Sequence, residues 1–104
     1  LSLFIFGRKN HDISSELEII AFMGGEYLNI IGLVSVPDES PLSVLLKRAR
    51  AVGMVPDALS RRLRSLPPEI SVLVNGDPLP PRSRSAARLR DGDSVSFFAA
   101  SSGG

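Results

Sequence analysis

Two stretches near the start of the chain have the hydrophobic pattern of β-strands. Residues 17–23 are apolar apart from Glu18, and their isoleucine and phenylalanine content favours a strand. Residues 27–36 place an apolar set on one strand face: Leu28, Ile30, Val34 and Val36. Gly24-Gly25 permits a tight turn between the two stretches, which predicts a β-hairpin. Before it, the polar residues 7–15 predict a loop.

The pattern changes to helical spacing after the hairpin. Ser40 is a suitable N-cap, Pro41 suits the first helical position, and Gly53 is typical of a helix C-terminus. Between them, apolar residues recur every three or four positions: Leu42, Leu45, Leu46, Ala49 and Val52. These features predict the main helix of the protein.

A second, shorter helix is predicted over residues 56–66, and Pro67-Pro68 ends it. Its apolar residues are expected to face inward: Ala58, Leu59, Leu63 and Leu66. Its basic residues are expected to face outward: Arg61, Arg62 and Arg64.

The last third of the chain begins with a further strand. Alternate positions of this strand are apolar: Ile70, Val72 and Val74. Asn75-Gly76 predicts a tight turn. Residues 77–81 are rich in proline, which predicts the edge of the sheet and excludes a central strand. Residues 82–90 predict an irregular segment that Leu89 anchors to the core.

The chain then makes one more turn and one more strand. Asp91-Gly92-Asp93 predicts the turn, and residues 94–98 predict the strand, with Val95 and Phe97 on one face. Residues 99–104 form a tail of small residues with nothing left to bury.

This order of elements predicts an α+β fold. A helix that follows a hairpin packs on the sheet, and the first and last strands can then lie parallel in its centre. We therefore expect a β-grasp (ubiquitin-like) fold, with a mixed sheet of four to five strands packed on one main helix plus a short second helix. Residues 1–16 are interpreted as an N-terminal extension and residues 17–104 as the domain.

Charge is nearly balanced over the chain but unevenly distributed. The net charge is +1, which gives no global field for binding nucleic acid or an anionic membrane. Ten basic residues lie between positions 47 and 90, against three acidic ones, whereas acidic residues dominate positions 12–39. A two-signed surface suits docking to protein partners, although a solvated helix face and a basic loop would give the same pattern.

Few residues offer chemistry of their own. His11 is the one histidine, cysteine is absent, and the eleven carboxylates have no metal-ligand spacing, so we expect neither an enzyme nor a metal site. The chain has no phosphate-binding glycine loop and should bind no ATP itself. The basic run 82–85 has no aromatic residue for stacking on nucleic acid. No apolar run approaches the ~18 residues of a membrane span, and a cytoplasmic location is expected.

The tail is the remaining candidate. The sequence ends in Gly103-Gly104 soon after a hydrophobic strand, and a chain without side chains can thread a narrow channel. Its terminal carboxylate could attack the α-phosphate of ATP on a partner enzyme, and the acyl-adenylate would be a good electrophile for a sulfur donor. The alternative is a flexible linker, whose composition the tail also has.

The C-terminal third resembles a known family. Its end is similar to the end of the small subunit of molybdopterin synthase. The similar part is the run Asp-Gly-Asp-Ser-Val-Ser-Phe-Phe at 91–98, followed by six residues that end in Gly103-Gly104. Val74-Asn75-Gly76 matches as well. Related sulfur carriers serve thiamine synthesis, cysteine synthesis and tRNA thiolation. Where the molybdopterin subunit usually has a Pro-Pro-Val-like tail, this chain has Ala99-Ala100-Ser101, which leaves another pathway open.

The resemblance implies a role for each part of the tail. Gly104 would be adenylated and then converted to a thiocarboxylate, while Gly103, Ser102 and Ser101 would thread into the partner. An adenylyltransferase related to ubiquitin-activating enzymes would supply ATP and Mg²⁺, and a large synthase-type subunit would accept the sulfur.

Partner docking is expected to involve the last strand. Phe98 is the main candidate, because it faces away from the core if its neighbours face inward, and Phe97 is the second. Phe98 could instead pack beneath a helix or the N-terminal extension. Two other functions also remain open: a ubiquitin-like modifier that is joined to lysines of target proteins, and a β-grasp interaction domain with an inert tail.

Overall fold

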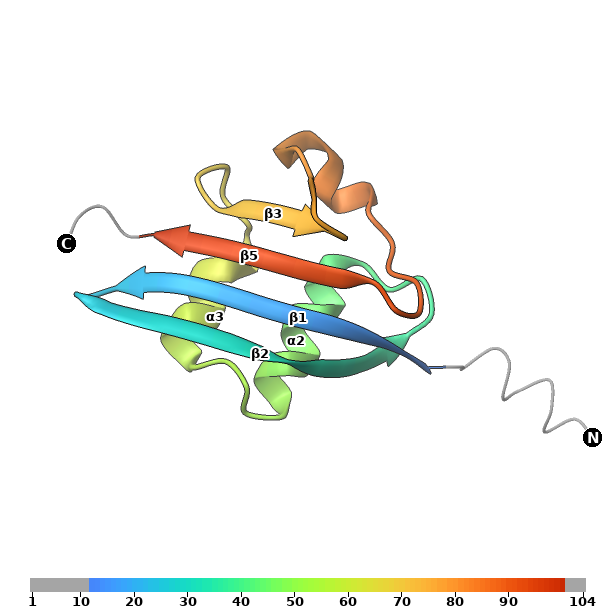
Figure 1. Cartoon of the computed structure of the whole chain (residues 1–104), viewed down its shortest axis with the longest axis horizontal. Coiled ribbons are helices and arrows are strands. Elements are labelled where there is room, and N and C mark those ends of the chain that lie inside the picture. Colours follow the sequence, from blue (N-terminus) through green and yellow to red (C-terminus); the bar gives the residue numbers. More distant parts are fainter. Residues whose placement is uncertain (1–11, 101–104) are drawn as a thin grey trace, which may run out of the picture.

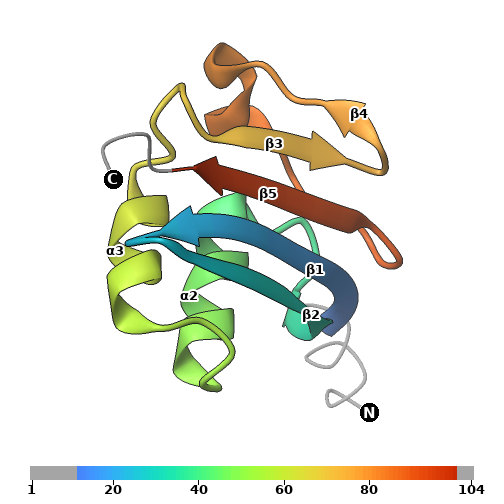
Figure 2. The ribbon, with the colours of Figure 1, turned by 60° about the vertical axis from the view of Figure 1, so that its left-hand side comes forward.

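The computed structural model describes residues 12–100, and both helices lie on one face of its five-stranded sheet (Figures 1 and 2). The strand order across the sheet is β2-β1-β5-β3-β4. The elements in chain order are β1 (Asp12–Met23), β2 (Glu26–Pro37), α2 (Leu42–Ala51), α3 (Asp57–Arg64), β3 (Ser71–Val74), β4 (Asp77–Pro78), the 3₁₀-helix η1 (Pro81–Ala86) and β5 (Ser94–Ala100).

The centre of the sheet is a parallel pair made from the first and last strands. β1 and β5 run parallel, with Leu17 opposite Val95 and Ile19 opposite Phe97, and every other neighbouring pair of strands is antiparallel. This arrangement confirms the predicted α+β, β-grasp fold. Its consequence for function is that β5 carries the chain out of the middle of the sheet towards the tail (Figure 1).

The hairpin is longer than predicted. β1 and β2 pair without interruption from Asp12 opposite Pro37 to Met23 opposite Glu26. The prediction of a loop over residues 7–15 is therefore wrong for residues 12–15. Ile13 and Ser15 are buried there, and the Ser15 hydroxyl donates to the Asp93 carbonyl at 3.0 Å. The buried Ser15 hydroxyl thus has a hydrogen-bond partner that is distant in the sequence, and the local pattern could not predict this contact.

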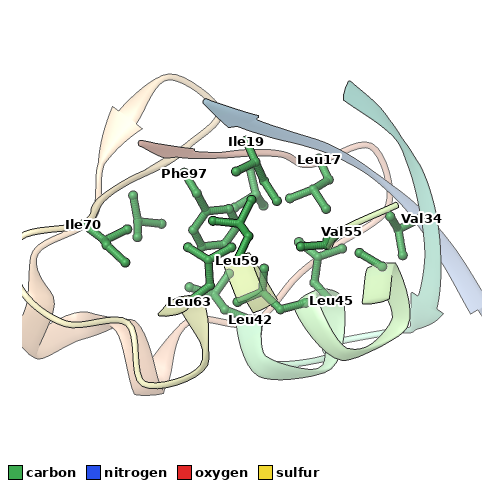
Figure 3. Packing of buried hydrophobic residues seen from close by; sticks show 14 of the residues in the cluster. Leu17, Ile19, Val34, Leu42, Leu45, Val55, Leu59, Leu63, Ile70 and Phe97 are labelled. Atoms are coloured by element: carbon green, nitrogen blue, oxygen red, sulfur yellow. The ribbon is translucent and has the colours of Figure 1, made fainter. Parts of the chain in front are cut away.

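The core lies between the sheet and the two helices (Figure 3). Its largest fully buried side chains come from strands and helices alike: Phe97, Leu17, Ile19, Leu42, Leu45, Leu59 and Leu63. Complete burial of a side chain of this size contributes about 1.5–3 kcal/mol. Leu89 is also buried, which confirms its predicted role as the anchor of the segment before β5.

Both helices differ from prediction at their ends. α2 begins after Pro41, and the Ser40 hydroxyl donates to the Pro37 carbonyl instead of capping the helix. Val52 lies beyond the last turn of α2 and is 69% exposed, so it does not extend the buried stripe. In α3, Ala58 is exposed, because Leu59 and Leu63 alone of its apolar residues turn towards the core.

The segment before β5 contains an ordered 3₁₀-helix rather than an irregular loop. Arg84 of this helix is buried and donates from Nη1 to the carbonyls of Leu66 and Pro67, at 3.1 Å each, and from Nη2 to the carbonyl of Ile70. The guanidinium of Arg84 therefore donates to backbone carbonyls of the segment that follows α3. The basic run 82–85 is thus not a fully solvated loop: Arg84 packs into the fold, whereas Arg82 is exposed.

Within residues 12–100, neither helix is long and apolar enough to cross a membrane. The same part of the chain holds no group of three or more histidine, cysteine, aspartate or glutamate side chains placed to bind a metal ion.

Candidate functional site

The site is built on β5, the strand that leads to the predicted carrier tail. Val95, Phe97 and Ala99 point into the core and are buried, whereas Phe98 points away from it and is 39% exposed. The predicted tail residues Ser101, Ser102, Gly103 and Gly104 lie outside the described residues.

Polar side chains of two turns fix the beginning of β5. The Asn75 amide donates from Nδ2 to Asp93 Oδ1 at 3.0 Å, and its Oδ1 accepts from the Ser94 backbone N–H at 2.9 Å. Asp93 Oδ2 accepts from the Arg90 backbone N–H at 2.8 Å, and Asp91 Oδ1 accepts from that of Ser14 at 2.9 Å. The motif residues that carry the family resemblance in these turns therefore set the register of the last strand.

The end of β5 has fewer strand neighbours than its beginning. β3 starts at Ser71, opposite Phe98, so Ala99 and Ala100 pair only with β1. Ala99 is nevertheless 2% exposed, which corrects the prediction that the tail begins at residue 99 with nothing to bury. Burial of this methyl group extends β5 by two residues beyond its predicted end at Phe98.

Arg62 on α3 reaches the end of this strand. Its Nη2 donates to the Ala100 carbonyl at 3.0 Å, although the two residues are 38 positions apart. The side chain is half-buried, so the prediction that it points fully outward is wrong, whereas Arg61 and Arg64 on the same helix are exposed as predicted. Arg62 was not predicted as a site residue because its partner is 38 positions away in the sequence. Helical periodicity did offer a signal, since it places Arg62 beside Leu59, at the border of the buried face of α3.

The face of the sheet opposite the helices carries exposed apolar side chains near the end of β5. Phe22 is 51% and Tyr27 is 53% exposed, and their ring centroids are 5.0 Å apart. Ile20 lies opposite Phe98 across the β1–β5 pair, and Phe22 lies opposite Ala100. These four side chains, Ile20, Phe22, Tyr27 and Phe98, are called the outer patch below.

The two candidate docking residues have different environments. Phe98 contributes to the outer patch, so its side chain is available on the surface. Phe97 is 0% exposed and packs in the core, and its inclusion as a docking residue is corrected accordingly. Phe22 and Tyr27 were not predicted as docking residues. The pattern of residues 17–23 could have indicated Phe22, because its apolar residues fall on both faces of the strand and the helices cover only one of them.

Acidic side chains adjoin the outer patch. Glu16 and Glu18 project from the same face of β1, and accept hydrogen bonds from the hydroxyls of Ser94 and Ser96 at 3.1 Å and 3.2 Å. Basic residues lie instead on the helical layer, where Arg50 forms an ion pair with Asp57 at 3.2 Å. Glu16 and Glu18 thus place acidic groups on the outer sheet face, whereas the exposed Arg50, Arg61 and Arg64 lie on the helices.

The polar side chains at the site have partners within the fold. Among residues 12–100, the acidic side chains at the site bond hydroxyls and backbone N–H groups, and the sole histidine, His11, lies outside the described range.

Comparison with known families gives a match over most of the chain. The family model described as ThiS family matches residues 33–104, which is more than half of the chain and includes both helices, β3 to β5 and the final Gly-Gly. No curated protein and no solved structure matches the chain significantly.

Proposed function

The chain belongs to the ThiS family of ubiquitin-like sulfur carriers, and we therefore propose that it carries sulfur as a thiocarboxylate on Gly104. Carriers of this family are small non-catalytic proteins that work with activating enzymes and synthases. The observation that carries the proposal is that the family match extends through Gly103-Gly104.

The proposed chemistry has two steps on partner enzymes. An oxygen of the Gly104 carboxylate attacks the α-phosphorus of ATP bound with Mg²⁺ to the activating adenylyltransferase, and pyrophosphate leaves. Hydrosulfide from the sulfide donor then attacks the carbonyl carbon of the acyl-adenylate, displaces AMP and loses its proton, which leaves the thiocarboxylate. This chain contributes the nucleophilic carboxylate and the surface by which the partner holds it.

The reach of the tail is compatible with this division of labour. Four residues follow Ala100, and an extended chain covers at most about 3.3–3.6 Å per residue, so the carboxylate can lie about 13 Å beyond the end of β5. A partner that binds the outer patch at the end of β5 could receive the carboxylate in a channel of that depth. Serine and glycine suit such a channel because they are small.

The pathway that we propose is molybdopterin synthesis. The support is the similarity of residues 91–98 and of the final Gly-Gly to the molybdopterin synthase small subunit. The thiocarboxylated chain should therefore lose its sulfur to a large molybdopterin synthase subunit supplied with precursor. Faster loss to a thiazole synthase would assign the carrier to thiamine synthesis instead.

The direct test is the intact mass of the full natural chain. We expect incubation with an activating adenylyltransferase of this family, Mg-ATP and a sulfide donor to add the mass that replaces one carboxylate oxygen by sulfur. Deletion of Gly104 should abolish the change. If the unaltered chain keeps its mass while the enzyme activates its own carrier, the proposal is wrong. Mass adducts on lysines of other proteins would identify a ubiquitin-like modifier.

A further inference from the structure

We infer that Arg62 is a positioning residue that holds the root of the carrier tail. It donates from Nη2 to the carbonyl of Ala100, the last residue before the four-residue tail. This inference rests on the proposed function for its purpose, but the contact itself can be tested without any partner.

The direction of the β5 carbonyls explains why a donor is needed at this point. The Ser94 carbonyl accepts from the Asn75 N–H at 2.7 Å, so it points towards β3, whereas the Asp93 carbonyl accepts from Glu16 on β1. Carbonyls alternate sides along a strand, and that of Ala100 therefore points to the β3 side. Because β3 starts opposite Phe98, no strand residue lies there to donate.

Arg62 fills this vacant position in the ladder. Figure 2 shows α3 on the helical side of the sheet, near the end of β5. The Arg62 guanidinium extends from α3 to the Ala100 carbonyl, at the strand edge that β3 leaves uncovered. The strand end is consequently held on both sides, by β1 through the Phe22–Ala100 pair and by α3 through Arg62. A strand end held on both sides has a defined position and direction at Ala100, its last residue.

Helix stability alone does not account for the placement of Arg62. A cation near the C-terminus of α3 interacts favourably with the helix dipole, but the exposed Arg61 and Arg64 already supply that. Arg62 instead buries its Nε, which has no hydrogen-bond partner among the described residues. Burial of an unsatisfied N–H is unfavourable. What the side chain gains in return is the contact with Ala100.

The expected consequence is a change in turnover rather than in docking. A fixed root limits the directions in which the carboxylate can lie once the partner has bound the sheet face. Loss of the contact should lower the fraction of bound carriers whose carboxylate reaches the ATP. We therefore expect Arg62 variants to lower kcat of adenylation by about three- to tenfold, the range of one hydrogen bond, and to change KM by less than about twofold.

The experiment compares Arg62→Met with Arg61→Met in the full chain. Both changes remove one positive charge from α3, but only the first removes the donor to Ala100. ¹⁵N relaxation of the isolated chain should show increased motion of Ala100 and Ser101 in Arg62→Met and no change in Arg61→Met. Arg62→Lys, which keeps one charged donor, should restore part of the order and part of kcat; it also serves if Arg62→Met fails to fold.

The outcomes separate the two proposals. Unchanged relaxation in Arg62→Met, or altered relaxation with unchanged kcat, would overturn the positioning role while leaving the carrier function intact. If the unaltered chain is never adenylated, the carrier function fails, and relaxation alone then decides whether Arg62 orders the strand end.

Discussion

At the scale of single residues, two arginines act through backbone carbonyls rather than through their charge. Arg62 bonds the end of β5, and Arg84 bonds three carbonyls between α3 and β3. Guanidinium groups suit this task because one side chain offers five N–H donors in a fixed geometry. Chain segments that have no neighbouring strand or helix are thereby tied to the fold.

Replacement of Arg84 should destabilise the protein. In Arg84→Met the carbonyls of Leu66 and Ile70 lose their donor, whereas that of Pro67 keeps the Ile70 N–H at 2.9 Å. An unsatisfied buried group costs about 1–3 kcal/mol. We expect the free energy of unfolding to fall by about 2–4 kcal/mol, measured by urea denaturation. Arg82→Met, on the exposed side of the same 3₁₀-helix, is the control. Equal stability of the two variants would show that the Arg84 contacts contribute little.

At the scale of elements, the C-terminal end of β1 is apolar on both faces of the sheet. Leu17, Ile19 and Ala21 face the helices, while Ile20 and Phe22 face the uncovered side. An exposed cluster that includes aromatic rings is typical of a protein-binding surface. Its location at the C-terminal ends of β1 and β5 places it beside the root of the tail.

A substitution in the outer patch should weaken docking without unfolding the sheet. Phe22→Ser removes a half-exposed ring, so we expect a loss of stability of about 1 kcal/mol from its contact with Tyr27. The Kd for the activating enzyme should rise about tenfold or more, as at an interface hot spot. Calorimetric titration measures this change.

The matched control for this variant is Leu33→Ser. Leu33 is 72% exposed on the same sheet face, but lies opposite Glu16, near the beginning of β5. If Kd rose equally in both variants, or did not rise in Phe22→Ser, docking at the outer patch would be contradicted.

At the scale of the whole molecule, the fold sorts charge between its two layers. The sheet face that carries the outer patch also carries Glu16 and Glu18, while the exposed Arg61 and Arg64 lie on α3. A partner that binds the sheet face should therefore present basic groups around an apolar centre. Such complementarity acts mainly on the rate of association.

Association with the activating enzyme should consequently depend on salt and on these glutamates. We expect kon to fall several-fold when ionic strength rises to about 1 M, where the screening length is about 3 Å. A variant with Glu16→Gln and Glu18→Gln should associate more slowly at low salt, whereas Arg61→Gln with Arg64→Gln should not. Stopped-flow fluorescence measures both. If the arginine variant were the slower one, the helix layer would be the docking surface.

Local sequence determined most of the β-grasp architecture. The Gly24-Gly25 and Asn75-Gly76 turns adopt the predicted tight conformations, with positive φ at all four residues. The stripe from Leu42 to Ala49 lies in the main helix, and Asp77 and Pro78, the first residues of the predicted edge 77–81, form the edge strand β4, whereas Pro81 begins η1. These features depend on neighbours within a few positions, and periodicity and backbone preference report such neighbours directly.

Tertiary structure decided what surrounds the root of the tail. The Arg62–Ala100 contact spans 38 residues and the Ser15–Asp93 contact spans 78, so no local pattern contains either. The pairing of Ile20 with Phe98 likewise arises only when β1 and β5 lie side by side. The sequence by itself thus indicated a carrier tail on a β-grasp domain. Packing alone decided which side chains contact the end of β5 and which face adjoins it, because both depend on segments that meet only in the folded chain.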